Sequence, residues 1–198
     1  MKLVDLSVKD FINSVASKEP TPGGGSVAAL MCANGAALTA MVARLTIGKK
    51  AYAEHELLMQ EIITKAEELK EKLIEFIDKD ADAYNDVAKV LSMPKGDERT
   101  IAMQEALKKA ASIPLEVMET GLLVMQTAAL AIGKSNTNAY SDLNIASINI
   151  YYGLMSAYYN IEINIKSIKD KNFNETVQYR AFDILEEAEG FFKLFDRE

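Results

Sequence analysis

Asp80 is well placed for acid–base chemistry, because it interrupts a stripe of apolar side chains. Alternating steps of four and three residues meet eight apolar positions and this one aspartate: Ile62, Ala66, Leu69, Leu73, Phe76, Asp80, Ala83, Val87 and Val90. This spacing predicts a helix face turned toward a core. A carboxylate held there needs a partner or has a raised pKa, and such carboxylates carry protons in catalysis. The pattern also fits a buried ion pair or a cap for a neighbouring helix.

Three consecutive glycines, Gly23, Gly24 and Gly25, form the second candidate feature, directly before Ser26. Glycine lets a backbone approach a ligand closely, and free N–H groups at the start of a helix attract anions or polar groups. No strand is expected before this turn and no Lys-Ser/Thr pair follows it, so it is neither a P-loop nor a dinucleotide fingerprint. The turn predicts either contact with a polar ligand or a simple connection.

Small and polar residues recur on one side of the apolar helix expected over about 141–167. They share helical spacing: Asp142, Ala146, Asn149, Gly153, Ser156, Asn160 and Asn164. Amide groups can read the donors and acceptors of a heterocycle, so this stripe predicts a wet, amide-lined cavity. Contact between helices or an exposed face would produce the same stripe.

A short basic segment could receive the carboxylate tail of a ligand. Arg44, Lys49 and Lys50 flank Thr46-Ile47-Gly48, and Lys134 could add to them. The same lysines could instead complement the negative end of a helix.

The elements that must position these groups are all predicted to be helices. Capping residues, glycine and proline stops and helical periodicity predict helices over about 7–16, 26–46, 54–92, 98–111, 114–132, 141–167 and 175–195. Ser7 and Ser26 are the expected N-caps of the first two. We therefore expect one domain over 1–198, an all-α multihelical bundle with long helices. The many alanines of the second helix favour close packing and a homo-oligomer.

The composition argues against several classes of partner and site for this protein. The net charge of −7 argues against nucleic acid and anionic membranes as partners. Residues 26–43 carry no charge but are mostly small, which favours a buried helix over a membrane span. The single cysteine, Cys32, and the single histidine, His55, suggest a core residue and a partly exposed helix start, and no metal site. The N-terminus lacks the apolar core of a signal peptide, so a cytoplasmic location is expected.

Six segments together resemble the formiminotetrahydrofolate cyclodeaminase / methenyltetrahydrofolate cyclohydrolase family, the C-terminal module of formiminotransferase-cyclodeaminase. In chain order they are PTPGGGSVAA (20–29), TIGKKAY (46–52), DKDADAY (78–84), ASIPLEV (111–117), SNTNAYSDLNIA (135–146) and YNIEINI (159–165). The resemblance implies an all-helical homodimer that acts on one-carbon units carried by tetrahydrofolate. It also implies that Asp80 is the catalytic residue.

The resemblance further implies which residues contact the substrate. They are Gly23, Gly24, Gly25, Ser26, Asn136, Asn138, Ser141, Asp142, Asn160 and Asn164. We expect the glutamate tail of the substrate to bind the basic segment, at Lys49, Lys50 or Arg44. The expected reaction is cyclodeamination of 5-formimino-tetrahydrofolate to 5,10-methenyl-tetrahydrofolate with release of ammonia. The folate would be the substrate, possibly polyglutamated, with no covalently bound cofactor and no metal. Two alternatives remain at this point: hydrolysis of 5,10-methenyl-tetrahydrofolate to 10-formyl-tetrahydrofolate, and a non-catalytic folate-binding or structural helical dimer.

Overall fold

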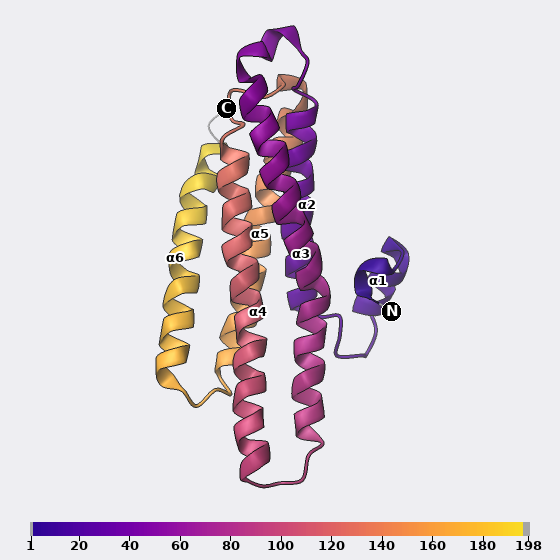
Figure 1. Ribbon diagram of the computed structural model, residues 1–198, viewed down its shortest axis with the longest axis vertical. Coiled ribbons are helices and arrows are strands. Elements are labelled where there is room, and N and C mark those ends of the chain that lie inside the picture. The colour runs from indigo at the N-terminus through magenta and orange to yellow at the C-terminus, as the bar shows by residue number, and fades with distance from the viewer. Residues whose placement is uncertain (1, 196–198) are drawn as a thin grey trace.

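The protein is an all-helical bundle, as the sequence predicted (Figure 1). The computed structural model describes residues 2–195, and within this range there are six α-helices and no strand. The α-helices are α1 (Val8–Val15), α2 (Gly24–Arg44), α3 (Glu56–Leu91), α4 (Asp97–Ala129), α5 (Tyr140–Ile165) and α6 (Lys171–Phe195). There are also three short 3-10 helices: Leu3–Asp5 before α1, Lys50–His55 between α2 and α3, and Thr137–Ala139 between α4 and α5. Ser7 caps α1 as expected, accepting a hydrogen bond from Asp10 N–H at 3.1 Å.

Helix α2 lies against α3, α4 and α5, and its small side chains let α5 approach closely. A Cβ added at Gly153 of α5 would lie 2.6 Å from Cys32 Sγ, and one at Gly35 would overlap Ile150. Cys32 is buried, and its burial raises the pKa of the thiol to about 12. The alanines of α2 therefore belong to a tightly packed interface, and Cys32 is a core residue as expected.

Helix α2 is also long and apolar enough to cross a membrane by length and composition. Most of it is buried inside the bundle, which is the usual setting of a core helix in a soluble protein. The structure thus supports the buried-helix interpretation of residues 26–43.

Helix α4 differs from the sequence prediction, which divided it at Pro114 into two helices. The structure has one continuous helix, with Pro114 in its interior. A proline there leaves the carbonyl four residues earlier without its intrahelical donor. That carbonyl belongs to Ala110, and the side-chain amide of Asn164 on α5 donates to it at 2.9 Å. A tertiary hydrogen bond therefore satisfies the group that the proline leaves free.

The long α3–α4 pair extends beyond the first residues of α2 (Figure 1). The loop between α3 and α4 lies at the same end of the bundle as the turn between α5 and α6. The segments 45–55 and 130–139 lie at the opposite end. The bundle thus has two distinct ends, and residues of the predicted site occur at both.

Candidate active site

Asp80 lies where α3 passes the beginning of α2, and it is half-buried. Its Oδ2 accepts a hydrogen bond from Ser26 N–H at 2.9 Å and lies 3.1 Å from Ser26 Oγ. The same hydroxyl lies 2.9 Å from the Ile77 carbonyl oxygen, so its single proton can serve one of these acceptors at a time. Within the described residues no cation forms an ion pair with Asp80, which excludes the buried ion pair as its role there.

The environment of Asp80 favours a protonated carboxyl group. Burial raises its pKa above the usual value of 3.8, while the two hydrogen bonds from Ser26 act in the opposite direction. The carboxylate also lies at the N-terminus of α2, where it caps a free N–H group. Asp80 is therefore a cap for a neighbouring helix, and burial among apolar residues raises the pKa of its carboxyl group.

The glycine run begins α2 rather than forming a turn ahead of it. Gly23 is the N-cap, Gly24 and Gly25 are the first two helical residues, and Ser26 lies inside the first turn. The expected N-cap role of Ser26 is therefore wrong: Gly23 takes that position, and Asp80 from α3 takes the role of the capping side chain. A Cβ at Gly25 would overlap Asp80 Oδ1, so only glycine allows this approach. The N–H groups of Gly24 and Gly25 have no intrahelical acceptor and remain available to a ligand.

Two asparagines of α5 face the same region. Asn164 Nδ2 donates to the Ala110 carbonyl at 2.9 Å, and Asn160 Nδ2 donates to the Ser156 carbonyl at 2.7 Å. In each side chain one of the two amide N–H groups is engaged, which fixes the amide and leaves the Oδ1 atom as an acceptor for a ligand. The rest of the predicted amide stripe has other roles: Ala146 and Gly153 are buried against α2, and the Asn149 amide bonds to its own helix.

A cavity of about 310 Å³ joins these groups. Its lining comes from the segment before α2 and from α2, α3, α4 and α5: Pro20, Thr21, Gly23, Gly24, Gly25, Asp80, Tyr84, Val87, Leu107, Ala110, Asn160 and Asn164. Seven predicted residues thus gather here: Gly23, Gly24, Gly25, Ser26, Asp80, Asn160 and Asn164. Tyr84 was not singled out, although its position four residues after Asp80 places it on the same helix face.

The other six predicted residues lie at the opposite end of α2, which at 21 residues is about 30 Å long. They are Lys49, Lys50, Asn136, Asn138, Ser141 and Asp142. Their two segments meet there, because Asn136 N–H donates to Thr46 Oγ1 at 2.9 Å and Thr137 N–H donates to Tyr52 Oη at 3.0 Å. We call this group the loop cluster. Within this chain the loop cluster does not lie near Asp80.

Among the described residues, no group of three His, Cys, Asp or Glu side chains is arranged to hold a metal ion. The polar side chains that line the cavity carry one carboxyl, one phenol, one threonine hydroxyl and two amides, and free backbone N–H groups border it. This set can orient a polar heterocycle and transfer a proton to or from it.

Comparison with known proteins identifies relatives over nearly the whole chain. The family described as formiminotransferase-cyclodeaminase matches residues 7–182. The methenyltetrahydrofolate cyclohydrolase of Methylorubrum extorquens is 36% identical over 187 residues, which cover 92% of this chain and 90% of that protein. The formimidoyltransferase-cyclodeaminase of Rattus norvegicus is 32% identical over 191 residues. These residues cover 94% of this chain but only 35% of the rat protein, so the chain spans about a third of that relative.

A solved structure has the same fold. The crystal structure of formiminotetrahydrofolate cyclodeaminase from Thermotoga maritima superimposes with a TM-score of 0.90 at 30% sequence identity. The superposition covers 98% of this chain and 95% of that one.

Proposed function

Because this chain belongs to the formiminotransferase-cyclodeaminase family of folate one-carbon enzymes, we propose that it converts 5-formimino-tetrahydrofolate to 5,10-methenyl-tetrahydrofolate and ammonia. The observation that carries this proposal is the position of Asp80. It is a half-buried carboxyl with a raised pKa, in a cavity bordered by free helix N–H groups and two amide oxygens.

Asp80 acts as a proton relay in the proposed reaction. N10 of the folate attacks the formimino carbon and forms the new C–N bond. The formimino group reacts in its protonated form, with its nitrogen as =NH2+, and the attack leaves an –NH2 group on the tetrahedral carbon. N10 then loses its proton and the –NH2 group gains one, so that the bond between this nitrogen and carbon breaks, ammonia departs and the methenyl cation remains. One carboxyl group can accept the first proton and deliver the second, provided that its pKa lies near the working pH. The substrate supplies both reacting nitrogens, so the protein contributes orientation and proton transfer without a covalently bound cofactor.

The amides and the start of α2 recognise the pteridine ring in this proposal. Asn160 and Asn164 present oxygen acceptors, which suit the amino and N–H donors of the ring. The free N–H groups of Gly24 and Gly25 suit its carbonyl oxygen. Ser26 holds Asp80 beside them through its own N–H and hydroxyl groups.

Hydrolysis of 5,10-methenyl-tetrahydrofolate is the second candidate activity. The specific observation in its favour is the Methylorubrum relative, which bears that name and matches this chain over 90% of its own length. In this reaction water attacks the methenyl carbon in place of N10, and the same carboxyl group would remove a proton from the water. The bond between that carbon and N5 then breaks as N5 gains a proton, which leaves the formyl group on N10 and releases one proton in total.

We further propose that the protein acts in the cytoplasm as a homodimer. Along α5 a face of large apolar side chains is exposed, formed by Ile145, Ile148, Tyr152, Tyr159 and Ile163. Exposed apolar faces of this extent commonly pack against a partner. A twofold axis across the middle of α5 would place the loop cluster of one subunit near the Asp80 cavity of the other. The six predicted residues of the loop cluster would then contact the substrate from the partner.

An absorbance assay tests the proposed function. Purified protein is incubated separately with 5-formimino-tetrahydrofolate and with 5,10-methenyl-tetrahydrofolate, and methenyl absorbance is followed over time. Its appearance from the formimino compound supports cyclodeamination. Its enzyme-dependent decay from the methenyl compound, without formation from the other substrate, supports the cyclohydrolase instead. If the protein accelerates neither change, the enzymatic proposal is wrong.

A further inference from the structure

We propose that the glutamate tail of the folate lies in a second cavity beside the Asp80 cavity, with Lys95, Arg99 and Lys169 as its counter-charges. This proposal rests on the proposed function, because it extends the same site to the rest of the same substrate. The second cavity has a volume of about 700 Å³ and lies at the end of the α3–α4 pair. We call it the distal cavity.

The two cavities are adjacent, since Val87 and Leu107 line both of them. The reason lies in the helix lengths: α2 begins beside Asp80, so the last turns of α3 and the first turns of α4 extend beyond it. Along α3 the lining continues from Asp80 through Tyr84 and Val87 to Leu91. These positions share one helix face and span about 16 Å along the axis. An extended ligand can therefore occupy both cavities at once.

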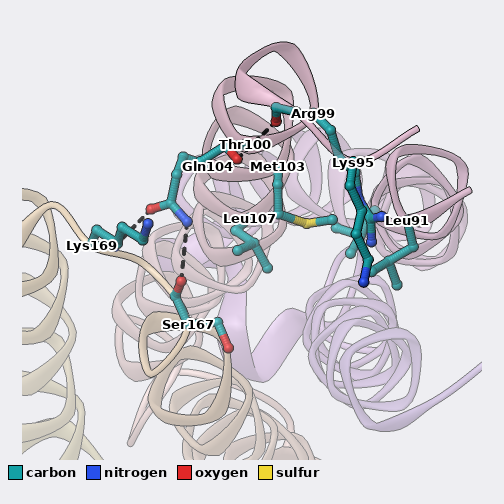
Figure 2. A pocket seen from close by; sticks show the side chains of 11 residues that line it. Leu91, Lys95, Arg99, Thr100, Met103, Gln104, Leu107, Ser167 and Lys169 are labelled. Carbon is teal, nitrogen blue, oxygen red and sulfur yellow. Dashed lines mark hydrogen bonds between the residues drawn. The ribbon is translucent and has the colours of Figure 1, made fainter. Parts of the chain in front are cut away.

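The lining changes character along this path. The Asp80 cavity is polar, the junction is apolar, and the far side is cationic. Met103, Leu107 and Leu91 border the distal cavity, with Lys95 and Arg99 on one side and Ser167 and Lys169 on the other (Figure 2). A folate has the same order of parts: a polar pteridine, an aromatic aminobenzoyl ring and an anionic glutamate tail. If the pteridine lies beside Asp80, the aminobenzoyl ring contacts the apolar junction and the glutamate tail contacts the cationic side.

The three cations are not neutralised by the protein. Among the described residues, Lys95, Arg99 and Lys169 form no ion pair with a carboxylate. Asp170, next to Lys169 in the chain, is instead paired with Lys108 at 2.9 Å. The Arg99 guanidinium donates a hydrogen bond to the Met93 carbonyl at 3.3 Å. In a protein of net charge −7, three unpaired cations around one cavity favour an anionic ligand.

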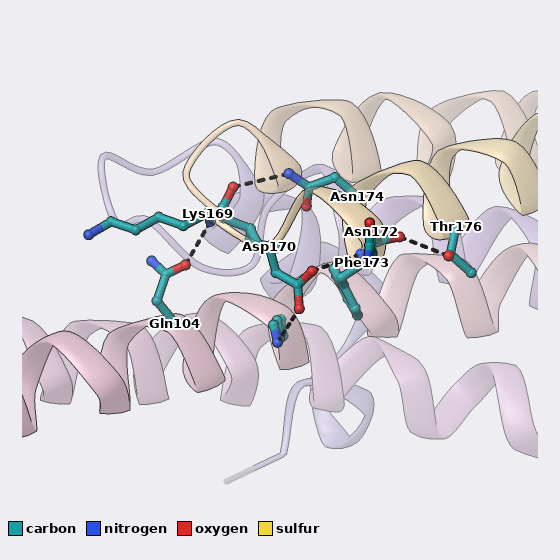
Figure 3. Close-up of polar contacts among 9 residues, drawn as sticks. Gln104, Lys169, Asp170, Asn172, Phe173, Asn174 and Thr176 are labelled. Carbon is teal, nitrogen blue, oxygen red and sulfur yellow. Dashed lines mark hydrogen bonds and ion pairs between the residues drawn. The ribbon is translucent and has the colours of Figure 1, made fainter.

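The backbone that carries Lys169 is held in place. Its N–H donates to Gln104 Oε1 at 2.7 Å, and Gln104 Nε2 donates to the Ser167 carbonyl at 3.3 Å (Figure 3). On the other side Asp170 Oδ1 accepts from Phe173 N–H at 3.1 Å and so begins α6 at Lys171. The turn between α5 and α6 is thus fixed to α4, and the cationic side chain projects from an ordered support.

This location differs from the one that the sequence suggested for the tail. Lys49 and Lys50 belong to the loop cluster, at the far end of α2 from Asp80. The distal cavity adjoins Asp80 within a single subunit. We therefore assign the tail to Lys95, Arg99 and Lys169, and leave the loop cluster to other contacts.

Kinetics with substrates of different tail length test this assignment. The substrate is 5-formimino-tetrahydrofolate, or the methenyl compound if only that one is consumed, each as monoglutamate and as triglutamate. We expect the wild-type KM to be about tenfold lower for the triglutamate, because more carboxylates meet the three cations. The Lys95→Gln/Lys169→Gln double variant should lose most of this preference and keep kcat within about twofold. Added salt should reduce the wild-type preference in the same way.

A matched control removes two positive charges elsewhere. The Lys65→Gln/Lys72→Gln variant changes exposed lysines of α3 that pair with Glu68, and it should keep the wild-type preference. If the double variant at Lys95 and Lys169 keeps the preference, or if only Lys49→Gln/Lys50→Gln abolishes it, the tail assignment is wrong while the proposed function stands. If wild-type protein turns over neither substrate, the proposed function fails and the assignment fails with it.

Discussion

At the scale of single residues, Asp80 combines two roles that are usually separate. Its carboxylate caps the first turn of α2 through Ser26 N–H, and it is the titratable group of the cavity with a raised pKa. An amide at this position could still accept the hydrogen bond from Ser26 but could not carry a proton. The asparagine variant therefore separates the structural role from the chemical one.

Asp80→Asn should lower kcat by about 10² to 10⁴-fold, the usual contribution of a positioned proton carrier. Its melting temperature should stay close to that of the wild type, because the cap is retained. Asp80→Ala, which removes the cap as well, should lose about 1 kcal/mol of folding stability in addition to activity. Steady-state kinetics and thermal unfolding of both variants check this. Full turnover by a folded Asp80→Asn enzyme would refute the proton relay.

The raised pKa of Asp80 also predicts how stability depends on pH. Over the interval between its unfolded pKa, near 3.8, and its higher native pKa, the native chain holds a proton that the unfolded chain has lost. The contribution of Asp80 to stability therefore decreases as pH rises through this interval. Urea unfolding of wild type and Asp80→Asn from about pH 4 to pH 7 should show the wild type losing stability relative to the variant. A relative gain would mean that the native pKa is lowered.

Gly25 and Gly24 form a matched pair for testing the close approach of α2 and α3. A Cβ at Gly25 would overlap Asp80, whereas one at Gly24 would meet Asn160 at an ordinary 3.4 Å. We expect Gly25→Ala to destabilise the fold by about 1–3 kcal/mol and to displace Asp80. Gly24→Ala should be neutral or stabilise by up to about 1 kcal/mol, since alanine favours helix. Equal stability of the two variants in chemical unfolding would contradict the close contact between Gly25 and Asp80.

At the scale of elements, Pro114 and Asn164 connect helix α4 to the active site. The proline removes the donor for the Ala110 carbonyl, and Asn164 of α5 supplies a replacement. This bond fixes the orientation of the Asn164 amide, so that its oxygen remains for the cavity. A proline inside one helix therefore determines how a side chain of another helix is oriented toward the cavity.

A double-mutant cycle tests this link. Asn164→Ala should destabilise the protein by about 1–3 kcal/mol, because it leaves the Ala110 carbonyl without a donor. In a Pro114→Ala background the new N–H at position 114 can bond to that carbonyl, so the same change should cost clearly less. Chemical unfolding of the four proteins yields the coupling energy, which we expect to be about 1 kcal/mol or more. Additive effects would show that the proline and the asparagine act independently.

At the scale of the whole molecule, the separation of the two groups of predicted site residues is the main finding. The loop cluster and the Asp80 cavity lie at opposite ends of α2. Segments from distant parts of the sequence build each group. In the proposed dimer, the exposed apolar face of α5 would unite the two groups across the subunit interface.

Mixed dimers test whether two subunits share one site. Asp80→Asn and Asn138→Ala should each reduce activity in the homodimer, the second because the exposed Asn138 side chain would contact the partner's substrate. After joint unfolding and refolding, half of the dimers are mixed, and each mixed dimer has one of its two sites intact. The mixture should then recover about a quarter of wild-type activity. Mixing Asp80→Asn with Asp80→Ala is the control, and it should recover none. If the first mixture shows only the average of its parents, each site belongs to one subunit.

Much of the helical architecture could be predicted from local sequence, because helical periodicity and capping depend on near neighbours. The stripe of α3 was predicted correctly as far as Ala83, and Ile62 and Phe76 are among its buried residues. Val87 and Val90 are only partly buried, because this end of α3 extends beyond α2. The main error in the predicted helix boundaries arises where a residue distant in the sequence makes a hydrogen bond that local sequence does not reveal. Pro114 does not end its helix, because a side chain from α5 satisfies the freed carbonyl. The start of α6 is a different, local error: the helix begins at Lys171 rather than near residue 175, because Asp170 directly before it accepts from Phe173 N–H.

For the site, the sequence alone identifies Asp80 as an unusual carboxylate, since an apolar stripe with one acid is visible in a single helix. The family also follows from the sequence, through motifs spread along the whole chain. The packing of the helices, in contrast, establishes which of those motifs share a cavity and that Lys95, Arg99 and Lys169 surround another. These three cations are far apart in the sequence and form no local pattern, whereas Lys49 and Lys50 are adjacent and form a recognisable basic pair. The difference arises because a binding site is assembled by helix packing, and packing brings together residues that no local pattern relates.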